Sequence, residues 1–210
     1  MFANGTIAAM QEVTPLPRGR HRLAREAVLE SQRGRMLHAM AHAVLEKGYV
    51  HTTVADVLRY ARVSRETFYE HFDDKEDCFL AAYALSVETL LDTMAAAAPT
   101  RATSPHTRLR RVLSAYLNVM SREEAMARVF LVDVYAAGPA ALERRREVMD
   151  QFVATIANLL EARTADERFA VEALVAAVSS MVTVRVAVGA FHELPGLLDP
   201  IMKIAQGFLP

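Results

Sequence analysis

Apolar and polar residues between positions 53 and 76 follow the pattern of two short helices joined by a tight turn. Four apolar residues recur at i, i+3, i+4 and i+7, which places them on one face of a helix: Val54, Val57, Leu58 and Ala61. Thr53 precedes them as a favourable N-cap, and Asp56, three residues later, completes a near relative of the capping box. The pattern therefore predicts a helix that begins at about Thr53.

The apolar pattern breaks over residues 61–64 and resumes in a second short helix. Ser64 is placed to cap this helix, which is expected to run from Arg65 to Phe72 and to bury Phe68 and Phe72. Its remaining positions carry hydrogen-bonding side chains: Arg65, Glu66, Thr67, Tyr69 and His71. A short polar helix braced by a preceding helix suits insertion into the major groove of DNA.

A third helix is expected to begin after Asp73 or Asp74, with Lys75 in its first turn. There, an ammonium group and free backbone N–H groups would together meet a phosphate. The apolar pattern then continues without a break from residue 77 to about Ala97, which predicts a long connecting helix. Upstream, a helix is predicted over residues 32–47, with residue 25 as the alternative start, and Gly48 supplies its stop.

The chain divides into three predicted parts. Residues 1–24 show little periodicity and form a flexible basic arm, residues 25–76 a DNA-binding domain, and residues 77–210 a helical domain. The basic side chains of the arm region either enter the minor groove beside the docked helices or stay solvated; they are Arg18, Arg20, Arg22 and Arg25.

The C-terminal part is expected to be helical throughout, over residues 107–120, 123–137, 140–161, 165–191 and 197–208. Within the third of these helices, Arg144, Arg145 and Arg146 are predicted to form a solvated patch. Residues 165–191 are apolar around nearly the whole circumference, so this helix needs cover on all sides, which a second subunit would provide. The β-branched stretch 182–188 also permits a strand, but no partner strand is evident. The fold class is therefore all-α, with about nine helices.

The string GYVHTTVADVLRYARVSRETFYEHFDDKEDCF, residues 48–79, resembles the helix-turn-helix of TetR-type transcriptional regulators. The resemblance covers roughly residues 30 to 80. One position departs from the family pattern, because Arg62 stands where the family often has glycine. If this residue has positive φ, its side chain costs about 1–2 kcal/mol.

The resemblance implies a sequence-specific DNA-binding regulator, usually a repressor that a small molecule releases from a palindromic operator. Its DNA contacts are carried over to Thr53, Tyr69 and Lys75 for phosphates, and to Arg65, Glu66 and Thr67 for base edges, with Ser64 and His71 as further backbone contacts. The family dimerises through its last two long helices, which here fall within residues 140–191. An effector would bind among the body helices.

Candidate effector-binding residues are the large or polar side chains of the predicted body helices: Tyr116, Met120, Phe130, Tyr135, Met149, Phe152, Met181, Arg185 and His192. Ordinary core packing is the alternative for each. Arg185 interrupts an apolar run and needs a partner, which is an anionic effector, an acid such as Asp133 or Glu172, or solvent. The methionine and aromatic content favours a largely apolar effector.

Charge is distributed unevenly along a chain whose net charge is −1. Residues 18–65 carry ten Lys or Arg against four acids, a local charge of +6, whereas the rest carries fourteen against twenty-one, or −7. A basic end on an acidic body is suited to phosphate attraction. Solvated helix faces are the alternative explanation.

Other function classes find little support in the sequence. Cys78 is the only cysteine, and acids beside it would raise its pKa, so neither a disulfide nor a Cys-based zinc site is expected. His38 and His42 have the spacing of helix metal ligands, but no third ligand lies nearby, and no metal or cofactor is predicted.

The longest charge-free run, residues 173–184, is too short to span a bilayer, so a cytoplasmic protein without membrane contact is expected. An activator or an architectural DNA-binding protein without an effector is the alternative function. An all-α enzyme is disfavoured, because there is no Gly-rich phosphate loop or nucleophile motif.

Overall fold

The computed structural model describes residues 25–98 and 103–207, and all of the regular structure in these ranges is helical. The predicted arm, residues 1–24, lies outside the described residues, as does the segment 99–102. The elements in chain order are α1 (Arg25–His51), α2 (Val54–Ala61), α3 (Arg65–Tyr69), α4 (Lys75–Ala97), α5 (Pro105–Arg122), α6 (Glu124–Leu131), the 3-10 helix η1 (Asp133–Ala136), α7 (Pro139–Leu160), α8 (Ala165–Ala187), the 3-10 helix η2 (Phe191–Leu197) and α9 (Leu198–Gln206). The all-α prediction is confirmed.

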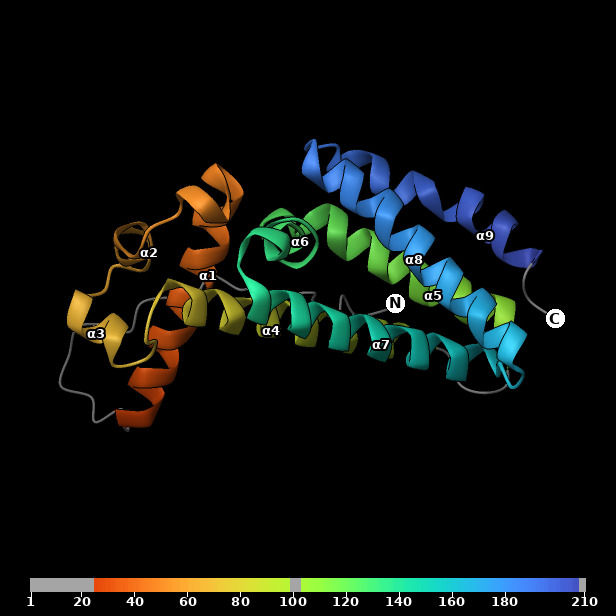
Figure 1. Ribbon diagram of the computed structural model, residues 1–210, viewed down its shortest axis with the longest axis horizontal. Helices are drawn as coiled ribbons and strands as arrows, with labels where there is room; N and C mark the ends of the chain where they lie inside the picture. Colours follow the sequence, from red (N-terminus) through yellow and green to blue (C-terminus); the bar gives the residue numbers. More distant parts are fainter. Residues whose placement is uncertain (1–24, 99–102, 208–210) are drawn as a thin grey trace, which may run out of the picture.

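The first three helices form a head at one end of the molecule, and helices α5 to α9 form an elongated body (Figure 1). The predicted capping box at the start of α2 is present: the Thr53 side chain accepts from the Asp56 N–H at 3.3 Å, and the Thr53 N–H donates to Asp56 Oδ2 at 2.9 Å. Lys47 forms an ion pair with the same carboxylate at 2.7 Å. The start of α2 is therefore tied to the end of α1.

The turn between α2 and α3 contains Arg62, the residue that stands where the family often has glycine. Arg62 has φ 54° and ψ 48° and ends α2, with its N–H bonded to the carbonyl of Leu58. At the residue before Arg62, the Ala61 carbonyl accepts a hydrogen bond from the Arg35 guanidinium of α1 at 3.1 Å. The turn therefore keeps the tight geometry although its left-handed position is not glycine.

Helix α1 breaks at Gly48, where the sequence predicts its end. Gly48 has φ 76° and ψ 159°, a backbone conformation open essentially to glycine alone. A further helical turn follows the break and carries the chain to His51. Gly48 therefore directs Tyr49, whose ring is buried, away from the axis of α1 and towards the body.

Helix α4 connects the head to the body (Figure 1). It begins at Lys75, as predicted, because Asp74 accepts the N–H of Asp77 and so caps Lys75 as the first helical residue. Its first turns bury Cys78 and Phe79 against α1, and its last turns bury Met94 among the body helices.

Two predicted helices of the body are divided or shortened. The segment predicted as one helix over residues 123–137 leaves α-helical geometry at Val132, with φ −116° and ψ −60°, and continues as η1. The helix predicted over residues 165–191 ends at Ala187, because Gly189 follows at φ 76°. The strand alternative for residues 182–188 is wrong, since 182–187 are the end of α8.

Helix α8 packs against α6, α7 and η2 but leaves large apolar side chains on its outer face. Phe169 is 71% exposed, Val184 59% and Val188 74%. Within a single chain α8 is thus far from covered on all sides. By length and composition alone, α4 and α8 are apolar enough to cross a membrane, a test that core helices of other proteins also pass. Of those two apolar stretches, half of the one in α4 is buried inside the protein, against 28% of the one in α8.

Candidate functional site

Helix α3 lies on the surface of the head and is fixed by its own N-cap. The Ser64 hydroxyl accepts from the Thr67 N–H at 3.0 Å, and the two hydroxyl oxygens lie 2.9 Å apart. Phe68 is fully buried beneath the helix and Phe72 nearly so. With only five residues, α3 depends on this cap and this packing to hold its shape.

The side chains on the outer surface of α3 are those that the sequence assigns to DNA. Arg65, Glu66 and Tyr69 are exposed, and Thr67 is partly exposed. The Tyr69 ring meets the buried Phe68 edge to face at 5.4 Å, and the Arg65 guanidinium lies 5.9 Å from the same tyrosine ring. Packing on both sides orients the tyrosine while its hydroxyl stays available.

Lys75 is partly buried at the start of α4. Its ammonium donates to the Tyr49 carbonyl at 3.0 Å and lies 4.0 Å from the centre of the Tyr49 ring. Burial lowers the pKa of this lysine. An ammonium has three N–H donors, so a phosphate contact at Lys75 stays open beside the bond to Tyr49.

Thr53 and His71, which are also predicted to contact the DNA backbone, differ in accessibility. Thr53 is exposed at the start of α2, whereas His71 is partly buried and its Nε2 has no hydrogen-bond partner. Burial lowers the pKa of His71, and the positive charge of Arg33 acts in the same direction. His71 is therefore biased towards the neutral form.

An apolar cavity of about 70 Å³ lies among the body helices. Four of the predicted effector residues line it: Tyr116, Phe130, Met149 and Phe152. Its other walls come from α4, α5, α7, α8 and α9: Met94, Leu109, Val112, Leu113, Ile156, Leu174, Val175, Val178, Ser179 and Ile201. Six helices, α4 to α9, thus contribute to the lining of this cavity.

The remaining predicted effector residues lie outside this lining. Met120 is fully buried in the core, Tyr135 is 55% exposed, and Met181 is partly buried on α8. Arg185 donates to the Met181 carbonyl at 3.0 Å and pairs with Glu193 at 3.3 Å. His192 is exposed. The acid beside Arg185 is therefore Glu193 instead of the predicted Asp133 or Glu172.

The prediction of a solvated arginine patch on α7 is wrong for its central member. Arg144 and Arg146 are exposed and form ion pairs with acids of the same helix. Arg145 is only 8% exposed; it donates to the Tyr135 hydroxyl at 2.8 Å and to the Ser179 hydroxyl at 3.2 Å. Consecutive residues of a helix point about 100° apart, so a run of arginines places one on the inner face.

Asp133 is a second residue whose role the sequence did not indicate. It is 5% exposed; its Oδ1 accepts the Tyr49 N–H at 2.7 Å, and its Oδ2 accepts the Arg128 Nε–H at 3.0 Å. The first bond joins η1 of the body to the break in α1 of the head. No local pattern signals this bond, because its partners are 84 residues apart.

Metal binding finds no further support. In residues 25–98 and 103–207, no group of three or more His, Cys, Asp or Glu side chains is arranged to hold an ion. The His38 pKa is lowered by burial and by His42. Cys78 is buried, and burial, with Asp77 as a smaller cause, raises its pKa to about 12.

Residues 37–82 match the sequence profile described as "Bacterial regulatory proteins, tetR family". Over this segment the chain is similar to the N-terminal domain of TetR-family regulators. The matched segment contains α2, α3 and the first turns of α4. The matched profile is one of transcription regulators, the class that the sequence favours over an enzyme.

Solved TetR-family structures share the fold over most of the chain. A TetR-like transcriptional regulator from Rhodococcus sp. RHA1 is 23% identical, with 92% of this chain and 99% of that one covered at a TM-score of 0.69. The regulator FadR from Bacillus subtilis, solved in complex with stearoyl-CoA, is 16% identical, with coverages of 81% and 95% and a TM-score of 0.71. The likeness therefore extends through the helical body.

Among curated proteins, the chain is similar to the HTH-type transcriptional activator FasR of Mycolicibacterium smegmatis. The two are 24% identical over 123 residues, which are 59% of this chain. The match spans 56% of the relative, little more than half of its length.

Proposed function

We propose that the protein is a sequence-specific DNA-binding transcriptional regulator whose affinity for its operator is controlled by a small apolar effector. The observation that carries this proposal is the surface of α3, where exposed Arg65, Glu66 and Tyr69 stand on a helix fixed by Ser64 within a TetR DNA-binding domain. An arginine can bond guanine with two hydrogen bonds, and a helix of this size fits the major groove.

Binding as a homodimer to a palindromic operator is part of the proposal. One short recognition helix covers few base pairs, so a symmetric pair of heads reading two half-sites supplies specificity. The exposed apolar residues on the outer face of α8, Phe169, Val184 and Val188, support an interface formed by α7 and α8, within residues 140–191. Large apolar side chains left exposed at both ends of one helix are typical of interaction surfaces.

The cavity in the body is the proposed effector site. Its lining is almost entirely aliphatic or aromatic, which suits an apolar ligand, and the FadR relative from Bacillus subtilis was solved with stearoyl-CoA. A cavity of about 70 Å³ is smaller than typical ligand pockets of roughly 300–1,000 Å³. Ligand entry therefore requires side chains to move, and Met94 and Met149 are flexible enough to do so.

Helix α4 is the proposed mechanical link between cavity and DNA. Met94 near its C-terminal end lines the cavity, and Lys75 at its N-terminus is bonded to the head through Tyr49. An effector that displaces Met94 changes the angle of α4 and thus the distance between the two heads of a dimer. DNA requires half-sites about 34–36 Å apart, so a shift of a few ångströms lowers affinity.

Release from the operator on effector binding makes the protein a repressor in this proposal. The FasR relative is described as an activator, so activation is the second candidate. Transcription measured from a promoter carrying the selected operator, with and without the protein, distinguishes the two by its sign.

Selection of the preferred DNA sequence from a random pool tests the proposal. Arg65→Ala is expected to relax the sequence preference, Tyr69→Ala to weaken all sequences about equally, and Arg122→Ala, an exposed arginine of the body, to change neither. Equal binding of wild type to random DNA and to every selected pool would indicate an architectural protein. Unchanged binding by both α3 variants would contradict the site assignment.

The dimer is tested by sedimentation at micromolar concentration, with Val188→Asp as the variant. Val188 lies at the exposed end of α8, and a buried carboxylate at an apolar interface is costly, so the variant is expected to be monomeric. A stable wild-type monomer would refute the proposed assembly.

A further inference from the structure

We propose that Arg145 binds the anionic head of the effector, which is therefore an apolar molecule carrying one carboxylate. This inference rests on the proposed effector site and names the class of ligand that the site takes. It is drawn from a buried positive charge that the protein itself leaves unbalanced.

The contacts of Arg145 leave its charge without an acid. Its Nε donates to the Tyr135 hydroxyl at 2.8 Å, its Nη2 donates to the Ser179 hydroxyl at 3.2 Å, and its Nη1 is shielded from solvent with no partner. Among the residues that the structure describes, no aspartate or glutamate forms an ion pair with it. Arginine keeps its proton in proteins, so burial does not remove the charge.

The other buried arginine of the body shows the arrangement that Arg145 lacks. Arg108 is 5% exposed, and its Nη2 lies 2.8 Å from the carboxylate of Glu161. Buried charges are normally paired in this way, because an uncompensated one is strongly unfavourable. Arg145 is thus nearly as buried as Arg108 but has no carboxylate partner.

Arg145 also lies beside the cavity. Ser179, which accepts its hydrogen bond, lines the cavity, and so does Met149, one helical turn further along α7. Tyr83 is fully buried, and its hydroxyl makes no well-formed hydrogen bond but lies close enough to Arg145 to interact with it. Its ring stacks on the cavity residue Phe130 at 5.7 Å between centres. Arg145 and Tyr83 are not themselves in the lining, but each contacts a residue that is, so both lie directly behind the cavity wall. Arg145 also lines an adjoining hollow between α7 and α8, which shares Met149 and Ser179 with the cavity.

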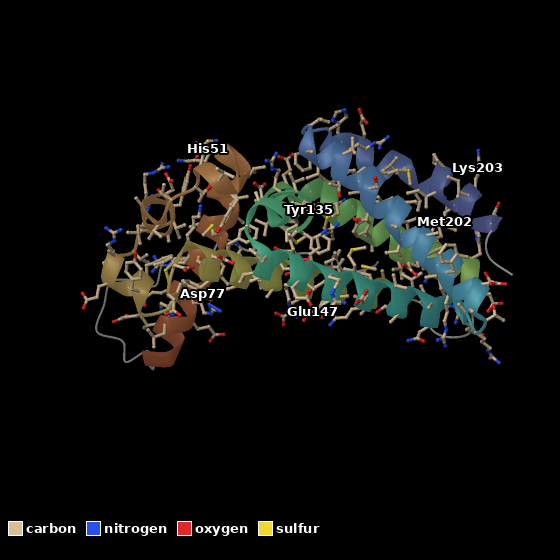
Figure 2. The ribbon with its side chains drawn as sticks, viewed as in Figure 1. His51, Asp77, Tyr135, Glu147, Met202 and Lys203 are labelled. Atoms are coloured by element: carbon tan, nitrogen blue, oxygen red, sulfur yellow. The ribbon has the colours of Figure 1, made fainter. Side chains whose placement is uncertain are left out.

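The guanidinium of Arg145 lies on the inner side of α7, where it bonds Ser179 of α8. Burial raises the pKa of Tyr83 to about 12, and the positive charge of Arg145 opposes this rise. Burial also raises the pKa of Tyr116, a cavity residue, and Arg145 again acts against it. Tyr135, the hydroxyl partner of Arg145, lies at the end of the body that faces the head (Figure 2).

A carboxylate is the head group that this arrangement fits. A guanidinium offers parallel N–H donors that match the two oxygens of a carboxylate, and the Tyr83 hydroxyl can donate to the same group. Such a ligand balances the buried charge with its head and fills the aliphatic part of the cavity with its tail. Its binding would also pull on Tyr83, which belongs to α4.

Calorimetry on the purified full-length protein tests the inference with dodecanoate and dodecanol, which share a chain and differ in the charged head. Wild type is expected to bind dodecanoate at least about tenfold more tightly, a difference of about 1.4 kcal/mol. Arg145→Gln is expected to reduce this ratio to about one and to leave dodecanol binding unchanged. The matched control, Arg146→Gln, removes the exposed neighbouring arginine and should keep the wild-type ratio.

Three results would overturn the inference: equal binding of the acid and the alcohol by wild type, a ratio in Arg145→Gln equal to that of wild type, or an Arg145→Gln defect confined to dimerisation. Dodecanoyl-CoA is a further ligand in the panel, and preference for it that survives Arg145→Gln would place the anionic contact elsewhere. If Arg145→Gln does not fold, Tyr83→Phe replaces it and is expected to weaken dodecanoate binding several-fold with dodecanol unaffected. An unchanged dodecanoate affinity in that variant would contradict the site.

DNA binding separates this inference from the proposed function. If the ligand-free protein selects an operator but shows no preference for carboxylates, the inference fails and the regulator stands. If the protein binds dodecanoate through Arg145 but selects no DNA sequence, the proposed function fails and the ligand site stands.

Discussion

Replacement of Asp133 by alanine tests whether the head and the body are held together by one buried carboxylate. Asp133 bonds the Tyr49 N–H at 2.7 Å and the Arg128 side chain at 3.0 Å, and only 5% of the residue is exposed. The alanine variant leaves a buried backbone N–H without an acceptor and a partly buried arginine without its acid.

The expected cost follows from these two losses. A hydrogen bond to a charged group contributes about 1.5–3 kcal/mol, and removal of one member of a buried ion pair costs about 3–5 kcal/mol. The two overlap, because one carboxylate makes both contacts, and Arg128 retains some solvent access. We therefore expect Asp133→Ala to lower the free energy of unfolding by about 3–4 kcal/mol. Asp133→Asn keeps one amide oxygen as acceptor and should lower it by about 1–2 kcal/mol.

Urea denaturation measures the global cost, and hydrogen exchange at the Tyr49 amide measures the local one. Both variants should accelerate exchange at Tyr49, since its N–H loses or weakens its acceptor. Asp150→Asn is the matched control: it removes an exposed acid paired with Arg146 and should change the unfolding free energy by less than about 0.5 kcal/mol. A loss below about 1 kcal/mol in Asp133→Ala, with unchanged exchange at Tyr49, would refute the argument.

Three further predictions concern the head and the first turn of α4. Arg62→Gly should raise the unfolding free energy by about 0.5–1 kcal/mol, because relief of left-handed strain outweighs the greater freedom of glycine in the unfolded chain; a lower melting temperature would contradict this. The lowered pKa of His38 means that the unfolded chain binds more protons as pH falls below about 6.5, so stability should fall there, and His38→Gln should flatten the slope of denaturation midpoint against pH. The buried Cys78 thiol, its pKa raised to about 12, should resist a thiol reagent at pH 8 until the protein is denatured; rapid labelling of folded protein would disprove its burial.

Local patterns were sufficient to predict the head. The capping box at Thr53, the cap at Ser64 and the break at Gly48 each involve residues within a few positions of one another, so the sequence displays both partners. The same holds for the exposed face of α3, which a short amphipathic helix determines once Phe68 and Phe72 are buried. The end of a helix is harder to predict: the helix expected to run to Phe72 ends at Tyr69.

The body was predicted as helices but not as a site. Its cavity lies where six helices meet, and neither the register of those helices nor the space left between them is encoded in the periodicity of any one of them. Four of the predicted lining residues reach it, whereas Met120 packs in the core and Tyr135 turns outward. An apolar pattern identifies the inward face of a helix without distinguishing a cavity wall from packed core.

The burial of charged side chains in the body could not be predicted from sequence patterns either. Arg185 interrupts an apolar run and is therefore a predicted effector residue, yet it pairs with Glu193 outside the cavity. Arg145 stood within a basic triplet that is typical of solvated surface, yet the helix turns it inward. Burial of a charge depends on what packs against the helix, which only the tertiary structure supplies.

Tyr49 is the residue at which the parts of the molecule meet. Its N–H is bonded to Asp133 of the body, its carbonyl accepts from Lys75 of α4, and its ring packs edge to face on Phe79 of α4 at 4.8 Å. The second and third contacts lie within the moving unit of head and α4, whereas the first crosses to the body. In the proposed mechanism, a movement of the head and α4 together relative to the body therefore strains the bond to Asp133 before any other contact of Tyr49. Because the bond forms where Gly48 breaks α1, we expect the glycine that ends this helix also to set how firmly the proposed effector site is coupled to the proposed DNA-binding surface.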